Sequence, residues 1–120
     1  MAEHNDLGHE GEERAREYLR SLGYEILECN WRFGSEEVDI IAKEGDTLVI
    51  AEVKTRSSNY FGEPEIAVTT KKKKTLVRAA DAYIRYKKID LEVRFDIISV
   101  IIGSGKCSIN HIPDAFYPTL

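Results

Sequence analysis

Cysteine and proline are scarce in this chain of 120 residues, which holds two cysteines and three prolines. The cysteines, Cys29 and Cys107, cannot form a disulfide framework, and neither lies in a paired-cysteine metal motif. The longest apolar runs, such as residues 97–103, are far too short to cross a bilayer. Residues 1–13 are acidic and lack a signal-peptide core. We therefore expect a soluble, cytoplasmic protein in a reducing compartment.

Several familiar catalytic motifs are also missing. The sequence has no glycine-rich phosphate loop, no Ser/His/Asp set for nucleophilic catalysis and no zinc motif. The histidines His4, His9 and His111 are scattered without metal-ligand spacing, so we interpret them as surface or capping residues. A metal site in this chain would rely on Asp and Glu, without His or Cys.

The composition is that of an ordinary globular protein, with 42% hydrophobic and 32% charged residues. A chain of this length buries about two-thirds of the surface that it exposes when unfolded, which is enough for a core without disulfides. No repeat or linker is visible in the sequence. We expect residues 1–120 to form one domain.

Positive charge gathers in one segment, although the net charge of the whole chain is -4. Residues 71–88 hold eight basic residues and one acid, which gives +7, so the remainder carries -11. The first four residues of this segment are Lys71, Lys72, Lys73 and Lys74. They open a predicted helix, where the helix dipole disfavours each cation by about 0.3–1 kcal/mol. Together with Arg78 they are expected to bind a nucleic-acid backbone, and the alternative is a solvated helix end.

Apolar spacing predicts helices and strands in a definite order. Residues 10–22 form an amphipathic helix, with Ala15, Leu19 and Leu22 on its inner face. A second helix begins near Thr69 or Thr70 and ends at about residue 87. The predicted strands are residues 24–33, 36–43, 47–56, 91–102 and 107–112. Residues 57–64 are predicted to form a flap or a loop that faces a substrate.

Charged side chains interrupt the apolar pattern of the second and third predicted strands. Glu52 and Lys54 share one face of the third strand with Leu48 and Ile50. A tight turn centred on residues 44 and 45 would place Asp39 opposite Ile50. Asp39 and Glu52 would then be diagonal neighbours, with about 7–8 Å between their backbones.

Two converging carboxylates repel each other and resist burial unless a cation lies between them. Mg²⁺ suits such a pair, because it takes oxygen ligands, keeps several waters and binds substrate phosphate. Lys54 would lie beside the same volume, where an amine can act on a polarised water or neutralise a transition state. The alternative is a solvated group of ion pairs on an exposed sheet face, in which Arg56 pairs with a carboxylate such as Asp39 instead of contacting phosphate.

A third acid, Glu12, lies about 20° from Leu19 around the first helix, at the margin of its apolar stripe. A helix bearing Glu12, a strand bearing Asp39 and a strand bearing Glu52-Val53-Lys54 resemble the PD-(D/E)XK nuclease superfamily. A closer resemblance, over about residues 8–100, is to the YraN-like family of small endonuclease-like bacterial proteins. In order, it rests on Gly8-x-x-Gly11-Glu12-x-x-Ala15, Gly23-Tyr24, Asn30-Trp31-Arg32, Glu37-Val38-Asp39-Ile40-Ile41, Glu52-Val53-Lys54-Thr55-Arg56, Phe61-Gly62 and Arg94-Phe95-Asp96.

The resemblance implies a restriction-endonuclease-like α/β fold, in which a mixed central sheet is flanked by helices around an αβββαβ core. It implies a Mg²⁺ or Mn²⁺ site at Asp39 and Glu52, with Lys54 beside it. It also implies a carboxylate from Glu12, as in the archaeal Holliday-junction resolvases of the same superfamily. This chain has Val38 where the superfamily often has a proline before the aspartate.

The first hypothesis is a metal-dependent endonuclease that hydrolyses phosphodiester bonds in DNA, branched or structured DNA included. DNA is favoured over RNA. Junction cutting would need two symmetry-related sites, which a homodimer would supply, but no sequence feature locates an interface. Asp39 and Glu52 would bind the metal, Lys54 would assist water attack, and Glu12 would orient water or a second metal. Arg56 and the basic segment would contact the backbone. The alternatives are a non-catalytic nuclease-fold module that binds nucleic acid or protein, and a subunit of a larger assembly.

Overall fold

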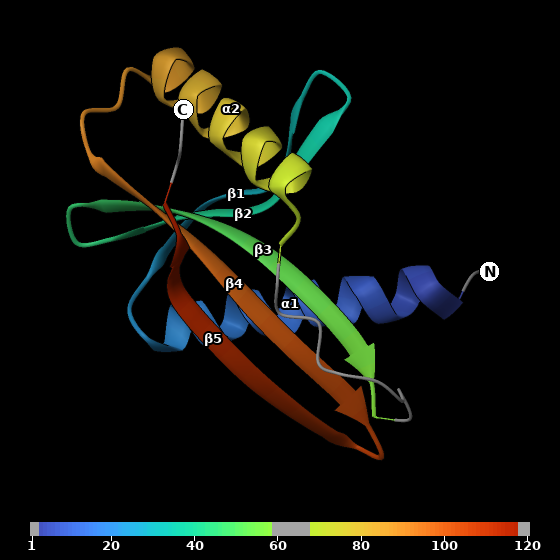
Figure 1. The fold of residues 1–120 in the computed structure, drawn as a ribbon. Helices are drawn as coiled ribbons and strands as arrows, with labels where there is room; N and C mark the ends of the chain where they lie inside the picture. The colour runs from blue at the N-terminus through green and yellow to red at the C-terminus, as the bar shows by residue number, and fades with distance from the viewer. Residues whose placement is uncertain (1–2, 59–67, 118–120) are drawn as a thin grey trace.

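Helices and strands follow one another in the order that the sequence predicts (Figure 1). The computed structural model describes residues 3–58 and 68–117. Its helices are α1 (Glu3–Ser21) and α2 (Thr70–Lys87). Its strands are β1 (Glu25–Phe33), β2 (Glu36–Glu44), β3 (Thr47–Ser57), β4 (Glu92–Gly103) and β5 (Lys106–Phe116). The predicted flap, residues 57–64, lies largely outside the described residues.

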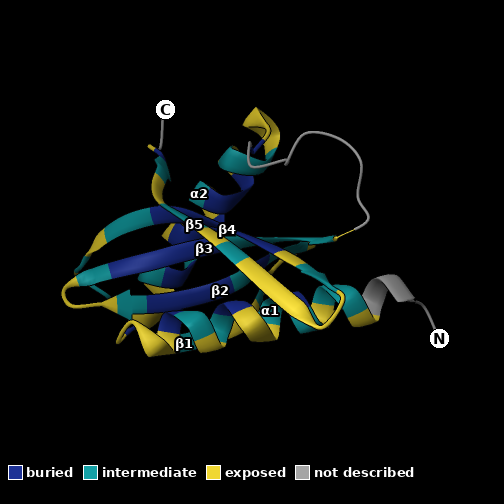
Figure 2. Ribbon diagram, turned by 90° about the horizontal axis from the view of Figure 1, so that it is seen from below, coloured by how far each residue is buried: buried dark blue, intermediate teal, exposed yellow. Residues whose placement is uncertain are grey.

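The strands form one mixed sheet with the spatial order β1-β2-β3-β4-β5. Neighbouring strands are antiparallel except β3 and β4, which run parallel and are joined in sequence by the connection that contains α2. Figures 1 and 2 show α1 on one face of the sheet and α2 on the other. The predicted α/β class, a mixed sheet flanked by helices, is confirmed, and it is compatible with a restriction-endonuclease-like fold.

The core has two layers, one on each face of the sheet. Ala15 and Leu19 of α1 pack in one layer, and α2 packs in the other. β3 contributes to both layers, because Val49 faces α1 and Ile50 faces α2, and both are fully buried. Burial of a side chain of this size contributes about 1.5–3 kcal/mol. Covered on both faces, β3 is the central support of the sheet, as Figure 2 shows by its dark colour.

The first helix differs from the prediction at both ends. It begins at Glu3, ahead of residue 10, and it ends at Ser21. Leu22, predicted to lie on the inner face, is 53% exposed, so that prediction is wrong. The reason is the helix end: Gly23 adopts a φ of +92°, and the Tyr24 N–H donates to the Leu19 carbonyl at 3.0 Å. Leu22 therefore lies in the turn that ends the helix, next to the left-handed Gly23, and its side chain does not reach the core.

The second helix confirms the prediction closely. Thr69 is its N-cap, and the Thr69 hydroxyl accepts a hydrogen bond from the Lys72 backbone N–H at 3.1 Å. The helix ends at Lys87, and Lys88 follows in the left-handed conformation with a φ of 55°. In the described part of the chain, no helix is long and apolar enough to span a membrane.

Candidate carboxylate site

Asp39 and Glu52 lie where β2 and β3 separate. The paired residues of the two strands run from Glu44 and Thr47 to Ile40 and Ala51. The turn is therefore centred on residues 45 and 46, and Ile41, not Asp39, lies opposite Ile50. The predicted register is wrong by two residues, because the tight turn includes Asp46 rather than Glu44.

The correction makes Asp39 and Glu52 direct counterparts, each one residue beyond the last pair of the ladder. Beyond this point the β1–β2 hairpin rises away from β3 toward α2 (Figure 1). The Val53 backbone N–H donates to Asp39 Oδ2 at 2.8 Å. The carboxylate thus replaces the carbonyl that a paired strand would have offered to Val53.

The charge of Asp39 is unfavourable in this position. Burial and the nearby Glu52 carboxylate raise the Asp39 pKa from 3.8 to about 7. The Val53 N–H and the Lys72 ammonium act in the opposite direction, and Glu12 adds to the rise in pKa. Asp39, Glu52, Glu12 and Lys72 therefore belong to one electrostatic neighbourhood, to which α1, β2, β3 and α2 all contribute.

Glu52 contributes the least satisfied group of the site. Its side chain is 14% exposed, and its Oε1 atom is buried without a hydrogen-bond partner among the described residues. Lys72 Nζ lies 3.6 Å from Oε1, within ion-pair range but beyond a hydrogen bond. A buried carboxylate oxygen in this state has unused capacity to accept a donor or to bind a cation.

Glu12 reaches the neighbourhood through a close contact between α1 and β3. A Cβ placed on Gly11 would overlap the Thr55 hydroxyl, so the helix backbone can lie against the strand only because residue 11 has no side chain. Glu12 Oε1 accepts a hydrogen bond from Asn30 Nδ2 at 3.0 Å. This contact gives Glu12 a fixed partner on β1.

Asn30 is a site residue that the sequence analysis missed. Its φ is 51°, and it is skipped in the β1–β2 ladder, where Cys29 pairs with Ile40 and Trp31 with Val38. The side chains therefore change sides at this point: Ile40 packs toward α1 and Val38 toward α2. An asparagine within a strand pattern was the available signal, because asparagine is rare in strands and tolerates the left-handed conformation.

The remaining predicted residues of β3 lie on the α2 side. Lys54 is half-buried, two residues after Glu52, and its register partner on β4 is Ser99. By strand alternation it shares the face of Glu52, as predicted. Arg56, two residues further on, donates from Nη1 to the Thr55 carbonyl at 3.0 Å.

The four lysines at the start of α2 do not gather on one surface. Lys72 points to Glu52, and Lys73 Nζ lies 5.5 Å from the centre of the Phe116 ring. Lys71 and Lys74 are exposed, as is Arg78 one turn later. Consecutive residues are 100° apart around a helix, so a run of four must face in different directions.

A second buried charge cluster lies away from this site. Asp96 of β4 has no exposed side-chain surface, and its Oδ2 lies 2.7 Å from His111 Nε2. Arg94 donates to both Asp96 oxygens at 2.9 Å. The Tyr18 hydroxyl lies 3.2 Å from His111 Nδ1. The prediction that His111 is a surface or capping residue is wrong, because its side chain is 6% exposed and joins β5 to β4 and α1.

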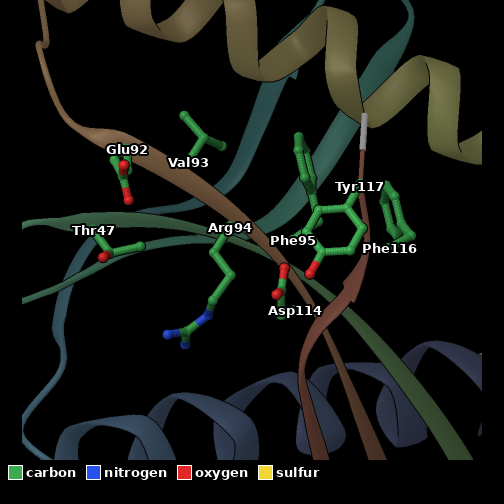
Figure 3. A pocket seen from close by; sticks show the side chains of 8 residues that line it. All are labelled: Thr47, Glu92, Val93, Arg94, Phe95, Asp114, Phe116 and Tyr117. Carbon is green, nitrogen blue, oxygen red and sulfur yellow. The ribbon is translucent and has the colours of Figure 1, made fainter. Parts of the chain in front are cut away.

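The cavity in Figure 3 also lies apart from the carboxylates. It measures about 230 Å³ and is lined by Thr47, Glu92, Val93, Arg94, Phe95, Asp114, Phe116 and Tyr117. Thr47 is five residues before Glu52 on β3, which corresponds to roughly 16 Å along an extended strand. Arg94 is committed to Asp96, Glu44 and Tyr24, so the cavity offers no free guanidinium.

The fit of a divalent metal rests on two carboxylates. Within residues 3–58 and 68–117, no group of three or more His, Cys, Asp or Glu side chains is arranged to hold a metal ion. Asp39 and Glu52 nevertheless suit Mg²⁺ or Mn²⁺, which binds through one or two carboxylates and completes its shell with water and phosphate. The buried, unpartnered Oε1 of Glu52 and the unfavourable charge of Asp39 both fit such an ion.

Comparison with known proteins identifies relatives over the whole chain. The profile of the uncharacterised protein family UPF0102 matches residues 11–100. A UPF0102 protein of Christiangramia forsetii is 54% identical over 117 residues, which cover 98% of each chain. A UPF0102 protein of Bacteroides thetaiotaomicron is 54% identical over 120 residues, covering 100% of this chain and 99% of the relative. The chain belongs to the UPF0102 family.

Proposed function

We propose that this protein is a metal-dependent endonuclease that hydrolyses phosphodiester bonds in DNA, branched or structured DNA included. One observation carries the proposal. At the point where β2 leaves β3, Asp39 and Glu52 are held close enough to raise the pKa of Asp39, and Glu52 keeps a buried oxygen without a hydrogen bond. Such an arrangement is unfavourable for folding and is typical of a site that binds a cation.

Asp39 and Glu52 are the residues that would hold Mg²⁺ or Mn²⁺. The bound ion would polarise the phosphate and lower the pKa of a water molecule. The Val53 N–H fixes one oxygen of Asp39, which leaves the other oxygen free to serve as a ligand. The site would thus use one oriented carboxylate from each strand.

Lys54 and Glu12 supply the groups around the reacting phosphate. Hydrolysis forms a bond from a water oxygen to phosphorus and breaks a phosphorus–oxygen bond, and the leaving oxygen takes up a proton. Lys54 lies on the face of Glu52 and provides an ammonium for the charge that builds on the phosphate. Glu12, held by Asn30, approaches from α1 and can accept a hydrogen bond from water.

The exposed cations of α2 would contact the DNA backbone. Lys71, Lys74 and Arg78 point into solvent from the helix whose first turn also brings Lys72 to Glu52. Contacts of lysine and arginine with phosphate supply affinity without reading sequence. The order of the elements that bear Glu12, Asp39 and Glu52-Val53-Lys54 supports membership of the PD-(D/E)XK nuclease superfamily.

A non-catalytic module that binds nucleic acid is the second candidate. The observation in its favour is that the described residues contain no group of three metal-ligating side chains. Such a module would need no divalent ion to bind DNA, and added Mg²⁺ would only weaken binding as any competing salt does, because binding would depend on the backbone contacts alone.

The decisive experiment compares cleavage of supercoiled and of branched DNA with Mg²⁺ or Mn²⁺ by the wild type and single variants. We expect Asp39→Asn, Glu52→Gln and Lys54→Ala each to abolish cleavage. Asp46→Asn is the matched control, because it removes an aspartate charge at the exposed β2–β3 turn. Unchanged cleavage by all three site variants would reject the assignment, and DNA binding without any cleavage would favour the second candidate.

A further inference from the structure

We propose that Lys72 is a built-in cation that occupies the carboxylate site in the metal-free protein and competes with a divalent ion for it. The inference rests on the proposed metal site and adds a control on its occupancy. It gives Lys72 a role different from the contact with a nucleic-acid backbone that the sequence predicts for all four lysines of the run.

Geometry singles out Lys72 within the run. Its Nζ lies 3.6 Å from the buried Oε1 of Glu52, and its charge also acts on Asp39. The ammonium therefore lies near both carboxylates that would bind Mg²⁺ or Mn²⁺. A divalent ion and an ammonium would repel each other strongly at such close range, so both cannot keep this position.

The ion pair is placed well enough to be populated and loose enough to be exchanged. The backbone of Lys72 is anchored, because its N–H donates to the Thr69 cap. Its side chain is 35% exposed, and Nζ stays beyond hydrogen-bond distance of Oε1. A flexible four-carbon stem allows the ammonium to move into solvent without any shift of the helix.

Charge balance explains why a resident cation is useful here. Of the side-chain charges that act on the Asp39 pKa, those of Glu52 and Glu12 raise it and that of Lys72 lowers it. Lys72 lowers the repulsion among these carboxylates in the absence of metal. When a divalent ion takes over this task, the ammonium is released into solvent at the N-terminal end of α2.

The test is a Mn²⁺ titration of the full-length, metal-free protein, followed by the loss of the free-ion signal in electron paramagnetic resonance. Lys72→Met removes the charge, keeps the length of the stem and adds no oxygen ligand. We expect it to bind Mn²⁺ more tightly than the wild type, by roughly two- to fivefold, which is the range that the energy of a partly exposed ion pair allows. Lys72→Ala repeats the charge removal with a smaller side chain.

Two further variants separate competition from a general change in charge. Lys72→Arg retains the cation and should leave the affinity near that of the wild type. Arg85→Met removes one charge from the exposed far end of the same helix and should have little effect. If both Lys72→Met and Lys72→Ala bind Mn²⁺ as the wild type does or more weakly, the inference about Lys72 is overturned and the proposed metal site still stands. Absence of Mn²⁺ binding from every protein, the wild type included, would overturn the metal site and the inference with it.

Discussion

Asp39 illustrates how a single residue can oppose folding for the sake of a site. Its carboxylate is buried beside Glu52, and its pKa lies near 7 instead of 3.8. A raised pKa in the folded state means that the protonated form is favoured there. The associated stability is complete below about pH 4 and is lost as the pH rises to about 7.

Asp39→Asn should therefore stabilise the metal-free protein at pH 8. The amide keeps an oxygen for the Val53 N–H and removes the charge that Glu52 opposes. We expect a melting temperature several degrees above that of the wild type, with the difference shrinking as the pH is lowered from 8 to 4. Added Mg²⁺ should raise the melting temperature of the wild type and leave that of the variant unchanged. A variant less stable than the wild type at pH 8 would contradict this account of Asp39.

Asp96 has the opposite behaviour. Burial acts to raise its pKa, but hydrogen bonds from His111, Arg94 and the Asp114 N–H outweigh burial and lower the pKa below 3.8. Its contribution to stability is therefore present above about pH 4 and is lost as the pH falls through the lowered pKa.

Asp96→Asn should destabilise the protein at pH 7 by about 3–5 kcal/mol, the usual cost of removing one partner from a buried ion pair. The measurement is the free energy of unfolding in urea. Asp81→Asn is the control, because Asp81 pairs with Arg85 at the surface and should contribute less than about 1 kcal/mol. Equal effects of the two substitutions on the free energy of unfolding would show that the buried ion pair of Asp96 contributes no more to stability than a surface pair.

At the scale of elements, the packing of α1 on β3 depends on Gly11. The Cβ of an alanine at this position would overlap Thr55. We expect Gly11→Ala to reduce the free energy of unfolding by about 1–3 kcal/mol, as overpacking usually does. Gly8 lies one turn earlier with open space around it, so Gly8→Ala should be neutral or stabilising by up to about 1 kcal/mol. Chemical denaturation of both variants tests the contrast, and equal stability would remove the argument for close contact.

Elements were easier to predict than their alignment. Repeating apolar residues are strong local signals, and the prediction of a start near Thr69 or Thr70 includes the observed N-cap, Thr69. The β2–β3 register depends on which pair of residues forms the turn, and Gly45 fits either choice. The left-handed Asn30 and the exposed Leu22 depend on how the chain turns between elements, which periodicity does not encode.

The residues of the candidate site show the same difference between what local sequence predicts and what depends on tertiary placement. Asp39 and Glu52 stood out because a charge in an apolar strand is anomalous by itself. Lys72 did not stand out from Lys71, Lys73 and Lys74, because only the placement of α2 decides which lysine meets Glu52. His111 was misinterpreted, since its partner Asp96 lies on another strand.

At the scale of the whole molecule, an acidic chain presents a local basic surface. Lys71 and Lys74 are exposed on α2, in a protein whose net charge is -4. If they contact DNA phosphates, the double substitution Lys71→Gln with Lys74→Gln should weaken binding and reduce the slope of log K against log salt by about 2. Fluorescence anisotropy with labelled DNA at several salt concentrations measures this slope. Lys106→Gln, at the exposed start of β5, is the control, and an unchanged slope in the double variant would exclude these contacts.

The close contact between Gly11 and Thr55 also affects how the molecule responds to a ligand. Since residue 11 has no side chain, only the short β-branched side chain of Thr55 lies between the α1 backbone and the β3 backbone. Any displacement of the central strand must carry the helix with it as a rigid pair. The spacing between the acid at position 12 and the acid at position 52 thus depends on the contact of the helix backbone with the Thr55 side chain, and it should survive changes that rearrange the other side chains around them.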